Sequence, residues 1–312
     1  MSEPHARSYP AVPAKELPGS RHGALESPAV AWHKPVFIGF LLVWMVNTVM
    51  ACLSLRPPMQ AAWVEGLLPI FAVATTLVGL GRWLPAQNIV AAAAFIGVVA
   101  YAAAWLAAKA GLVFGPIIFK DVPPLPRPGW VPWWQPCLWI VVVINARGVA
   151  RLMLRRWREV RHYPWLFLGV TCALIVAFDV ALEPFATRPG GYWVWRTWGN
   201  SAPWTIGGVP LSNYVGWLGC AVLMVMSTFI GLAHKRPVQL LPDYHPLVVW
   251  VLLCGWVTAG NAAAGAWTGF GIALGLSLLA LGITIANPAA YTLKDSERAR
   301  RVDGSAGLRP RG

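Results

Sequence analysis

The chain has 312 residues, of which 57% are hydrophobic and only 12% are charged. Soluble globular domains carry about 25% charged residues, and a water-soluble fold of this length has too much surface to cover with so few charges. The composition therefore excludes an ordinary cytosolic enzyme and a disordered protein, and it indicates a polytopic membrane protein.

The two ends of the chain are polar. Residues 1–32 are rich in Pro, Ser, His and charge and lack the apolar core of a signal peptide, which predicts a disordered cytoplasmic tail. Residues 291–312 form a second, basic tail that we also expect in the cytoplasm. The region between them, 33–290, is the predicted transmembrane helical domain.

This domain contains eight apolar stretches, each close to the ~20 residues that a membrane-spanning helix needs. The sequence therefore predicts an all-α polytopic integral membrane protein of the inner (plasma) membrane. The stretches cover approximately residues 35–54, 62–80, 88–108, 131–150, 164–182, 213–233, 246–264 and 268–288.

The distribution of basic residues predicts the orientation of these helices. With eight helices and a cytoplasmic N-terminus, 19 of the 25 Lys and Arg residues fall in cytoplasmic segments. Such a bias follows the positive-inside rule, so both termini are expected in the cytoplasm. The basic loops also account for the net charge of +13 without a nucleic-acid partner.

Several cofactor signatures are missing from the sequence. The five cysteines lie in apolar runs without CxxC spacing, and the six histidines show no HxxxH spacing. No GxGxxG follows a strand pattern, and no DxxxD pair could hold a magnesium diphosphate. We therefore expect activity without a metal or a redox cofactor.

Two acidic residues stand out at membrane depth. Asp179 and Glu183 are four residues apart, so they share one helix face near its outer end, and Pro184 is expected to end that helix. A carboxyl group in hydrocarbon must be paired, hydrated or protonated because an isolated charge there is costly. The simplest alternative is structural: these acids either pair with a basic residue of the neighbouring loops (Arg188, Arg196 or Lys120) or cap helix ends.

The segment around these acids is the most distinctive part of the chain. It reads D-V-A-L-E-P-F from residue 179, G-G-Y-W-V-W from residue 190 and G-G-V-P-L-S-N-Y-V-G-W from residue 207. This pattern resembles the integral-membrane carotenoid biosynthesis family, whose characterised members include hydratases of acyclic carotenoid ends. Glu183 stands where the family pattern has Asp. An earlier segment that contains Phe114 and Gly115 also resembles the family's Phe-Gly segment.

The resemblance implies a lipophilic carotenoid substrate in the bilayer, with other carotenoid enzymes as possible partners. Hydration needs an acid, a shield for a tertiary cation and a positioned water, and aromatic faces stabilise a cation by roughly 0.5–2 kcal/mol each. We expect Asp179 to donate the proton and Glu183, with Asn213, to position the water, although the two acids could exchange roles. The expected substrate-binding residues are Tyr192, Trp193, Trp195, Asn213, Trp217 and Phe114.

Two alternatives remain open at this point. A carotenoid cyclase or isomerase would protonate the same alkene but end in ring closure or double-bond migration instead of water capture. A non-catalytic transporter or scaffold is the alternative from another class, although transporters often contain inverted repeats and this chain shows none. Elsewhere, we expect Arg147 to extend to the membrane surface beside a helix-end Asn145, and Asn47 and Asn261 to form interhelical hydrogen bonds.

Overall fold

The computed structural model describes residues 28–55, 63–120, 129–158, 160–188, 191–196, 204–232 and 242–286. Within these residues the fold consists mainly of eight α-helices, which confirms the predicted all-α polytopic architecture. The helices are α2 (Pro28–Cys52), α3 (Trp63–Gly81), α4 (Ala86–Ala110), α5 (Trp134–Met153), α6 (Tyr163–Thr187), α7 (Leu211–Ser227), α8 (His245–Ala263) and α9 (Trp267–Ala286).

Seven of these eight helices are long and apolar enough to cross a membrane. The exception is α7, which is apolar but has 17 residues. At 1.5 Å per residue it covers about 26 Å, slightly less than the ~30 Å hydrocarbon core. The turns at residues 228–232 continue the chain beyond it, so the predicted stretch 213–233 corresponds to a shorter helix followed by a turn.

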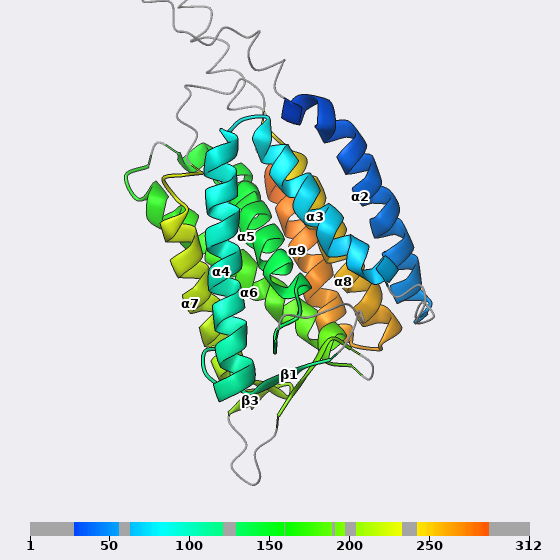
Figure 1. Cartoon of the computed structure of the whole chain (residues 1–312). Coiled ribbons are helices and arrows are strands. Elements are labelled where there is room, and N and C mark those ends of the chain that lie inside the picture. The colour runs from blue at the N-terminus through cyan, green and yellow to red at the C-terminus, as the bar shows by residue number, and fades with distance from the viewer. Residues whose placement is uncertain are drawn as a thin grey trace, which may run out of the picture.

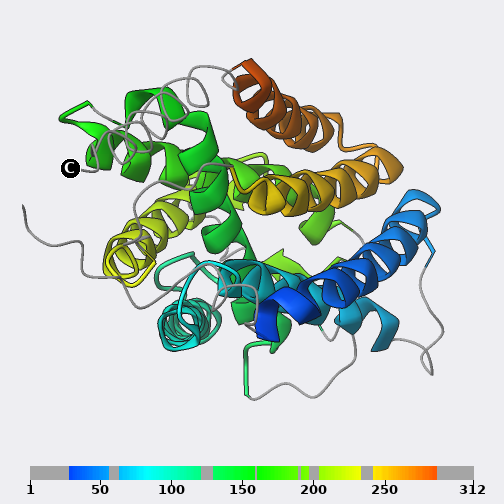
Figure 2. The same ribbon diagram turned by 90° about the horizontal axis from the view of Figure 1, so that it is seen from above.

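Helix α5 is the centre of the bundle. It packs against α3, α4, α6 and α8, and it also contacts α7 and α9 (Figure 2). In the most apolar part of α5, 67% of the residues are buried, compared with 17% in that of α2 at the edge of the bundle. Residues carried by α5 therefore lie where most other helices can reach them.

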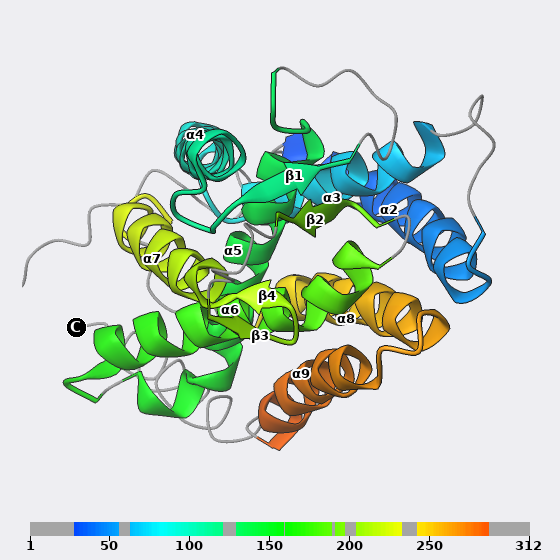
Figure 3. The same cartoon turned by 90° about the horizontal axis from the view of Figure 1, so that it is seen from below.

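Successive helices run in alternating directions, so the connections gather at two ends (Figure 1). Two small sheets occupy one end (Figure 3). Strand β1 (Ile117–Phe119) pairs antiparallel with β2 (Trp193–Trp195), and β3 (Thr205–Ile206) pairs with β4 (Val209–Pro210). The first pair joins the α4–α5 connection to the α6–α7 connection.

Two glycines allow the α4–α5 connection to approach α7. Gly115 has a φ of +95°, a left-handed conformation that glycine adopts without strain. Gly216 faces the same segment from α7, and a Cβ there would collide with the carbonyl oxygen of Val113. Because neither position carries a side chain, Phe114 can pack closely against α7, the helix that carries Asn213.

Two boundaries differ from the sequence-based expectation. Helix α6 continues to Thr187 with Pro184 inside it, so the prediction that Pro184 ends the helix is wrong. Helix α2 begins at Pro28, ahead of the expected start at residue 33. The remainder of the two predicted tails lies outside the described residues.

The orientation of the bundle stays a prediction, based on the charge bias and on the even number of helices. Reporter fusions after residue 301 and in the loop at Arg158 should both report the cytoplasm. A fusion in the connection 121–128 should report the opposite side. A periplasmic signal at either of the first two positions would contradict this orientation and would move the strand-bearing end to the cytoplasmic face.

Candidate active site

The structure brings Asp179 and Glu183 together with Asn213 inside the helix bundle. Both carboxyl groups project from one face of α6 and are almost completely buried, with exposed fractions of 0% and 1%. Asn213, in the first turns of α7, donates hydrogen bonds from Nδ2 to Asp179 Oδ2 at 2.8 Å and to Glu183 Oε1 at 3.2 Å. One side-chain amide thus joins the two acids.

The two acids differ in their remaining hydrogen bonds. Glu183 Oε2 accepts from the indole nitrogens of Trp195 at 3.1 Å and Trp193 at 3.4 Å, both on β2. Asp179 Oδ1 has no hydrogen-bond partner among the described residues. Glu183 therefore accepts three hydrogen bonds and Asp179 accepts one.

The structural alternative for these acids finds no support in their contacts. Among the described residues, their hydrogen bonds come from an amide and two indoles and not from a basic side chain. The guanidinium of Arg188 donates instead to the carbonyl oxygen of Gly260, at 3.0 Å. In the described part of the chain, the ion pair between Arg82 and Asp243 does not involve either of these acids.

A small cavity borders this carboxyl pair. It encloses about 330 Å³, counting the part open to the outside. Glu183 and Asn213 line it, whereas Asp179 does not. Its remaining lining consists of Phe114, Ile117, Phe119, Gln135, Leu138, Trp193 and Trp217.

Aromatic rings pack closely around the small cavity. Trp217 stacks on Trp139 with ring centroids 3.9 Å apart, and Phe114 lies 6.1 Å from Trp139. Trp193 stacks on Trp134 at 6.1 Å. The expected residues Phe114, Trp193 and Trp217 are thus brought together at the acids.

Sequence reasoning missed three residues of this site, all on α5. Trp134 and Trp139 support the stacked rings, and Gln135 lines the small cavity with its Oε1 atom buried and without a described hydrogen-bond partner. The sequence shows Trp134 and Trp139 only as tryptophans of an apolar stretch, which an interfacial belt also contains. Their spacing of five residues on one span was the available signal, but a belt produces similar spacings.

A larger apolar cavity adjoins the small one. It encloses about 650 Å³, again counting its open part, and Trp193 and Leu138 line both cavities. Tyr192 and Glu65 belong to this larger cavity, so Tyr192 lies apart from the carboxyl pair. The remaining lining residues are Asn47, Leu68, Pro69, Ala72, Trp134, Cys137, Val141, Leu182, Leu253 and Trp256.

Other polar residues in the spans serve mainly to join helices. Asn47 Nδ2 reaches the carbonyl oxygen of Val64 on the next helix at 3.5 Å, and Asn261 Nδ2 donates to that of Ala181 at 2.8 Å, as expected. Asn145 Nδ2 donates to Thr76 Oγ1 at 2.9 Å, which connects α5 to α3. In the part of the chain that the structure describes, three or more His, Cys, Asp or Glu side chains do not gather into a metal-binding group.

Comparison with known proteins gives one family. The model of a family described as carotenoid biosynthesis protein matches residues 61–282, which include both acids, the aromatic segment, the small cavity and all of the larger cavity's lining except Asn47. Searches of curated proteins and of solved structures returned no match. The family match covers more than half of the chain and agrees with the motifs around the carboxyl pair. The chain therefore belongs to the carotenoid biosynthesis protein family.

Proposed function

We propose that the protein is a carotenoid hydratase that adds water across the terminal double bond of an acyclic carotenoid end. The observation that carries this proposal is the buried carboxyl pair, joined by Asn213 and bordered by an aromatic cavity. An acid for the alkene, an aromatic wall for the cation and polar groups for the water are the three requirements of this reaction.

The carboxyl pair supplies the acid. Two negative charges on Asp179 and Glu183 would be costly in this buried setting, so the pair holds one proton. Glu183 accepts three hydrogen bonds, which stabilise a carboxylate, and Asp179 accepts one. The resting proton therefore belongs to Asp179 and the negative charge to Glu183.

The positions of the two acids relative to the small cavity suggest how the proton moves. Glu183 lines the cavity and Asp179 does not. Glu183 is the member that meets the substrate, so the single proton of the pair moves from Asp179 to Glu183 before it is transferred to the alkene. This arrangement favours Glu183 as the final donor to the alkene, which is the exchanged version of the roles expected from the sequence.

The reaction is balanced without a further reactant. The proton adds to the less substituted alkene carbon, and the alkene π electrons form the new C–H bond. The tertiary cation left at the other carbon accepts a lone pair of water, which forms the C–O bond. The bound water then returns one proton to the carboxylate, so the product is a tertiary alcohol and the pair regains its starting state.

Aromatic rings protect the cation until water reaches it. Phe114, Trp193 and Trp217 line the small cavity beside Glu183. One face of Trp217 is occupied by Trp139, so its free edge or opposite face is available to the substrate. Gln135 Oε1, buried in the same cavity wall, is a further acceptor that could hold the water.

The apolar part of the substrate fits the larger cavity. This cavity adjoins the small one at Trp193 and is lined mostly by apolar side chains. An acyclic end placed against Glu183 could therefore continue into it, past Trp193 toward Tyr192. This placement assigns Tyr192 to the polyene chain and not to the reacting carbons.

The direct test is the pigment made by cells that accumulate lycopene or another acyclic carotenoid. Expression of the full chain should yield a product heavier than the substrate by one water and more polar on reversed-phase chromatography. A cyclic or isomeric product of unchanged mass would identify the cyclase or isomerase alternative instead. Unchanged pigments across several such hosts, with the protein present in the membrane, would contradict an enzymatic role.

The carboxyl pair is tested by Asp179→Asn and Glu183→Gln. Each variant keeps the shape of the side chain but removes an acid, so product formation should fall by about 10²–10⁴, the contribution of general acid catalysis. Glu65→Gln makes the same change at the acid that lines the larger cavity, and it tests that acid as the alternative donor. Near-normal turnover of both pair variants, with the loss appearing in Glu65→Gln, would place the acid elsewhere.

Metal independence is a separate prediction. The sequence lacks the ligand spacings of a metal or nucleotide site, and the carboxyl pair can supply the proton by itself. Purified protein treated with a chelator should therefore keep converting carotenoid in liposomes. Loss of activity that iron or a nucleotide restores would contradict the acid mechanism and favour redox chemistry.

A further inference from the structure

Gln135 lies in the first turn of α5 and lines the small cavity beside the carboxyl pair. Its side chain is buried, with an exposed fraction of 6%, and its Oε1 atom has no hydrogen-bond partner in the described part of the chain. Burying an amide oxygen without a hydrogen bond is costly, and folded proteins satisfy most such atoms with a protein group or a water. A donor inside the cavity would therefore bind favourably to this oxygen.

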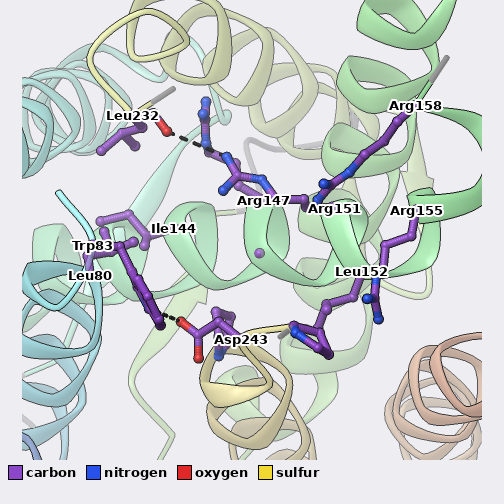
Figure 4. Close-up of a pocket in the computed structure, with 13 residues that line it drawn as sticks. Leu80, Trp83, Ile144, Arg147, Arg151, Leu152, Arg155, Arg158, Leu232 and Asp243 are labelled. Atoms are coloured by element: carbon purple, nitrogen blue, oxygen red, sulfur yellow. Dashed lines mark hydrogen bonds between the residues drawn. The ribbon is translucent and has the colours of Figure 1, made fainter. Parts of the chain in front are cut away.

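A buried polar side chain farther along α5 is engaged differently. Arg147 has an exposed fraction of 4%, so the expectation that it extends to the membrane surface is wrong. Its Nη1 atom donates to the carbonyl oxygen of Val225 at 3.2 Å and to Thr228 Oγ1 at 3.4 Å. Arg147 and Arg151 line a second pocket, of about 720 Å³ with its open part, at the end of the bundle opposite the strands (Figure 4). Arg147 thus holds the end of α7, whereas Gln135 Oε1 makes no such contact within the described residues.

The hydrogen bonds around the carboxyl pair do not use Gln135 Oε1. Asn213 Nδ2 donates to both acids, and Glu183 Oε2 accepts from the indoles of Trp193 and Trp195. Glu183 and Gln135 come from different helices, α6 and α5, and both line the small cavity. The cavity wall therefore holds a second oxygen acceptor in addition to the acid.

Two acceptors are what a reacting water requires. A water that captures a cation presents a lone pair to the carbon, so both of its hydrogens must point to acceptors elsewhere. Once Glu183 has protonated the alkene, its carboxylate is one acceptor, and Gln135 Oε1 is the second. The small cavity of about 330 Å³ has room for a water, which occupies ~30 Å³ in the liquid.

We propose that Gln135 decides the fate of the cation, because it orients the water that captures it. This inference rests on the proposed hydration and concerns its second step. Without an oriented water, a C–H bond next to the cationic carbon gives its electron pair to a new double bond, and the proton returns to the carboxylate of Glu183. This second outcome releases the original alkene or a double-bond isomer, with no net change of atoms. Gln135 is thus a positioning residue that favours alcohol over alkene.

The two outcomes are separated by product analysis in deuterium oxide. The purified full chain in liposomes receives lycopene, and mass spectrometry follows the products at early conversion. Each protonation places deuterium on the less substituted alkene carbon. Water capture then gives a deuterated alcohol, whereas loss of a hydrogen from a neighbouring carbon gives a deuterated alkene. The ratio of these products reports the fate of the cation, independently of how often it forms.

Gln135→Met keeps the length of the side chain but removes the acceptor. The ratio of alcohol to deuterated alkene should fall by about tenfold, because a hydrogen bond to the reacting water is lost while the carboxyl pair still protonates the alkene. Gln135→Glu keeps an oxygen at this position and should retain most of the ratio. Gln87→Met is the matched control, since Gln87 is exposed on α4 and outside the lining of the small cavity. It should behave like the unchanged protein.

A structural role for Gln135 gives a different result, since an unstable variant loses both products together. An unchanged ratio in Gln135→Met, including a parallel loss of both products, would overturn the inference. If Gln135→Met does not accumulate in the membrane, Gln135→Asn carries the test, because it withdraws the amide by one methylene group and should lower the ratio in the same direction. Failure of the hydration proposal appears separately, as the absence of alcohol from the unchanged protein.

Discussion

The arrangement of this protein depends on the cost of placing two carboxyl groups inside an apolar bundle. Asp179 and Glu183 are buried on α6, away from water, so their oxygens need donors from other elements. Asn213 on α7 and the two indoles of β2 provide those donors. The β1–β2 pairing and the close approach of α7 therefore serve the same purpose, which is to bring polar hydrogens to two buried acids.

Much of the helical fold could be predicted from the sequence because bilayer thickness sets the length of each apolar stretch. The shared face of Asp179 and Glu183 follows equally from helix geometry. The three-residue strands β1 and β2 are too short to show an alternating pattern, so their pairing could not be predicted. Pro184 shows a local rule overridden by its context, since α6 continues past it to Thr187.

The candidate site was predictable only where it lies within a motif. The acids, Asn213, Trp193 and Trp217 belong to the segment that resembles the family, and the structure brings them together. Trp139 and Gln135 lie in a span without such a signal. Their role depends on contacts between α5 and other helices, and a sequence does not show which face of a buried helix meets which neighbour. Only contacts across the bundle distinguish a tryptophan of the site from a tryptophan at the membrane interface.

Helix α5 connects the two polar regions and also keeps them apart. Gln135 borders the small cavity, and Arg151 lines a second pocket near the other end of the bundle. These two positions are 16 residues apart, which corresponds to about 24 Å along the helix, most of the hydrocarbon thickness. The carboxyl pair and this pocket therefore lie toward opposite ends of the bundle. Helix α7 is held at both places, by the hydrogen bonds of Asn213 at its start and by that of Arg147 at its end. Removal of either contact should loosen this short helix. The two acids depend on it, because it carries the amide that they share.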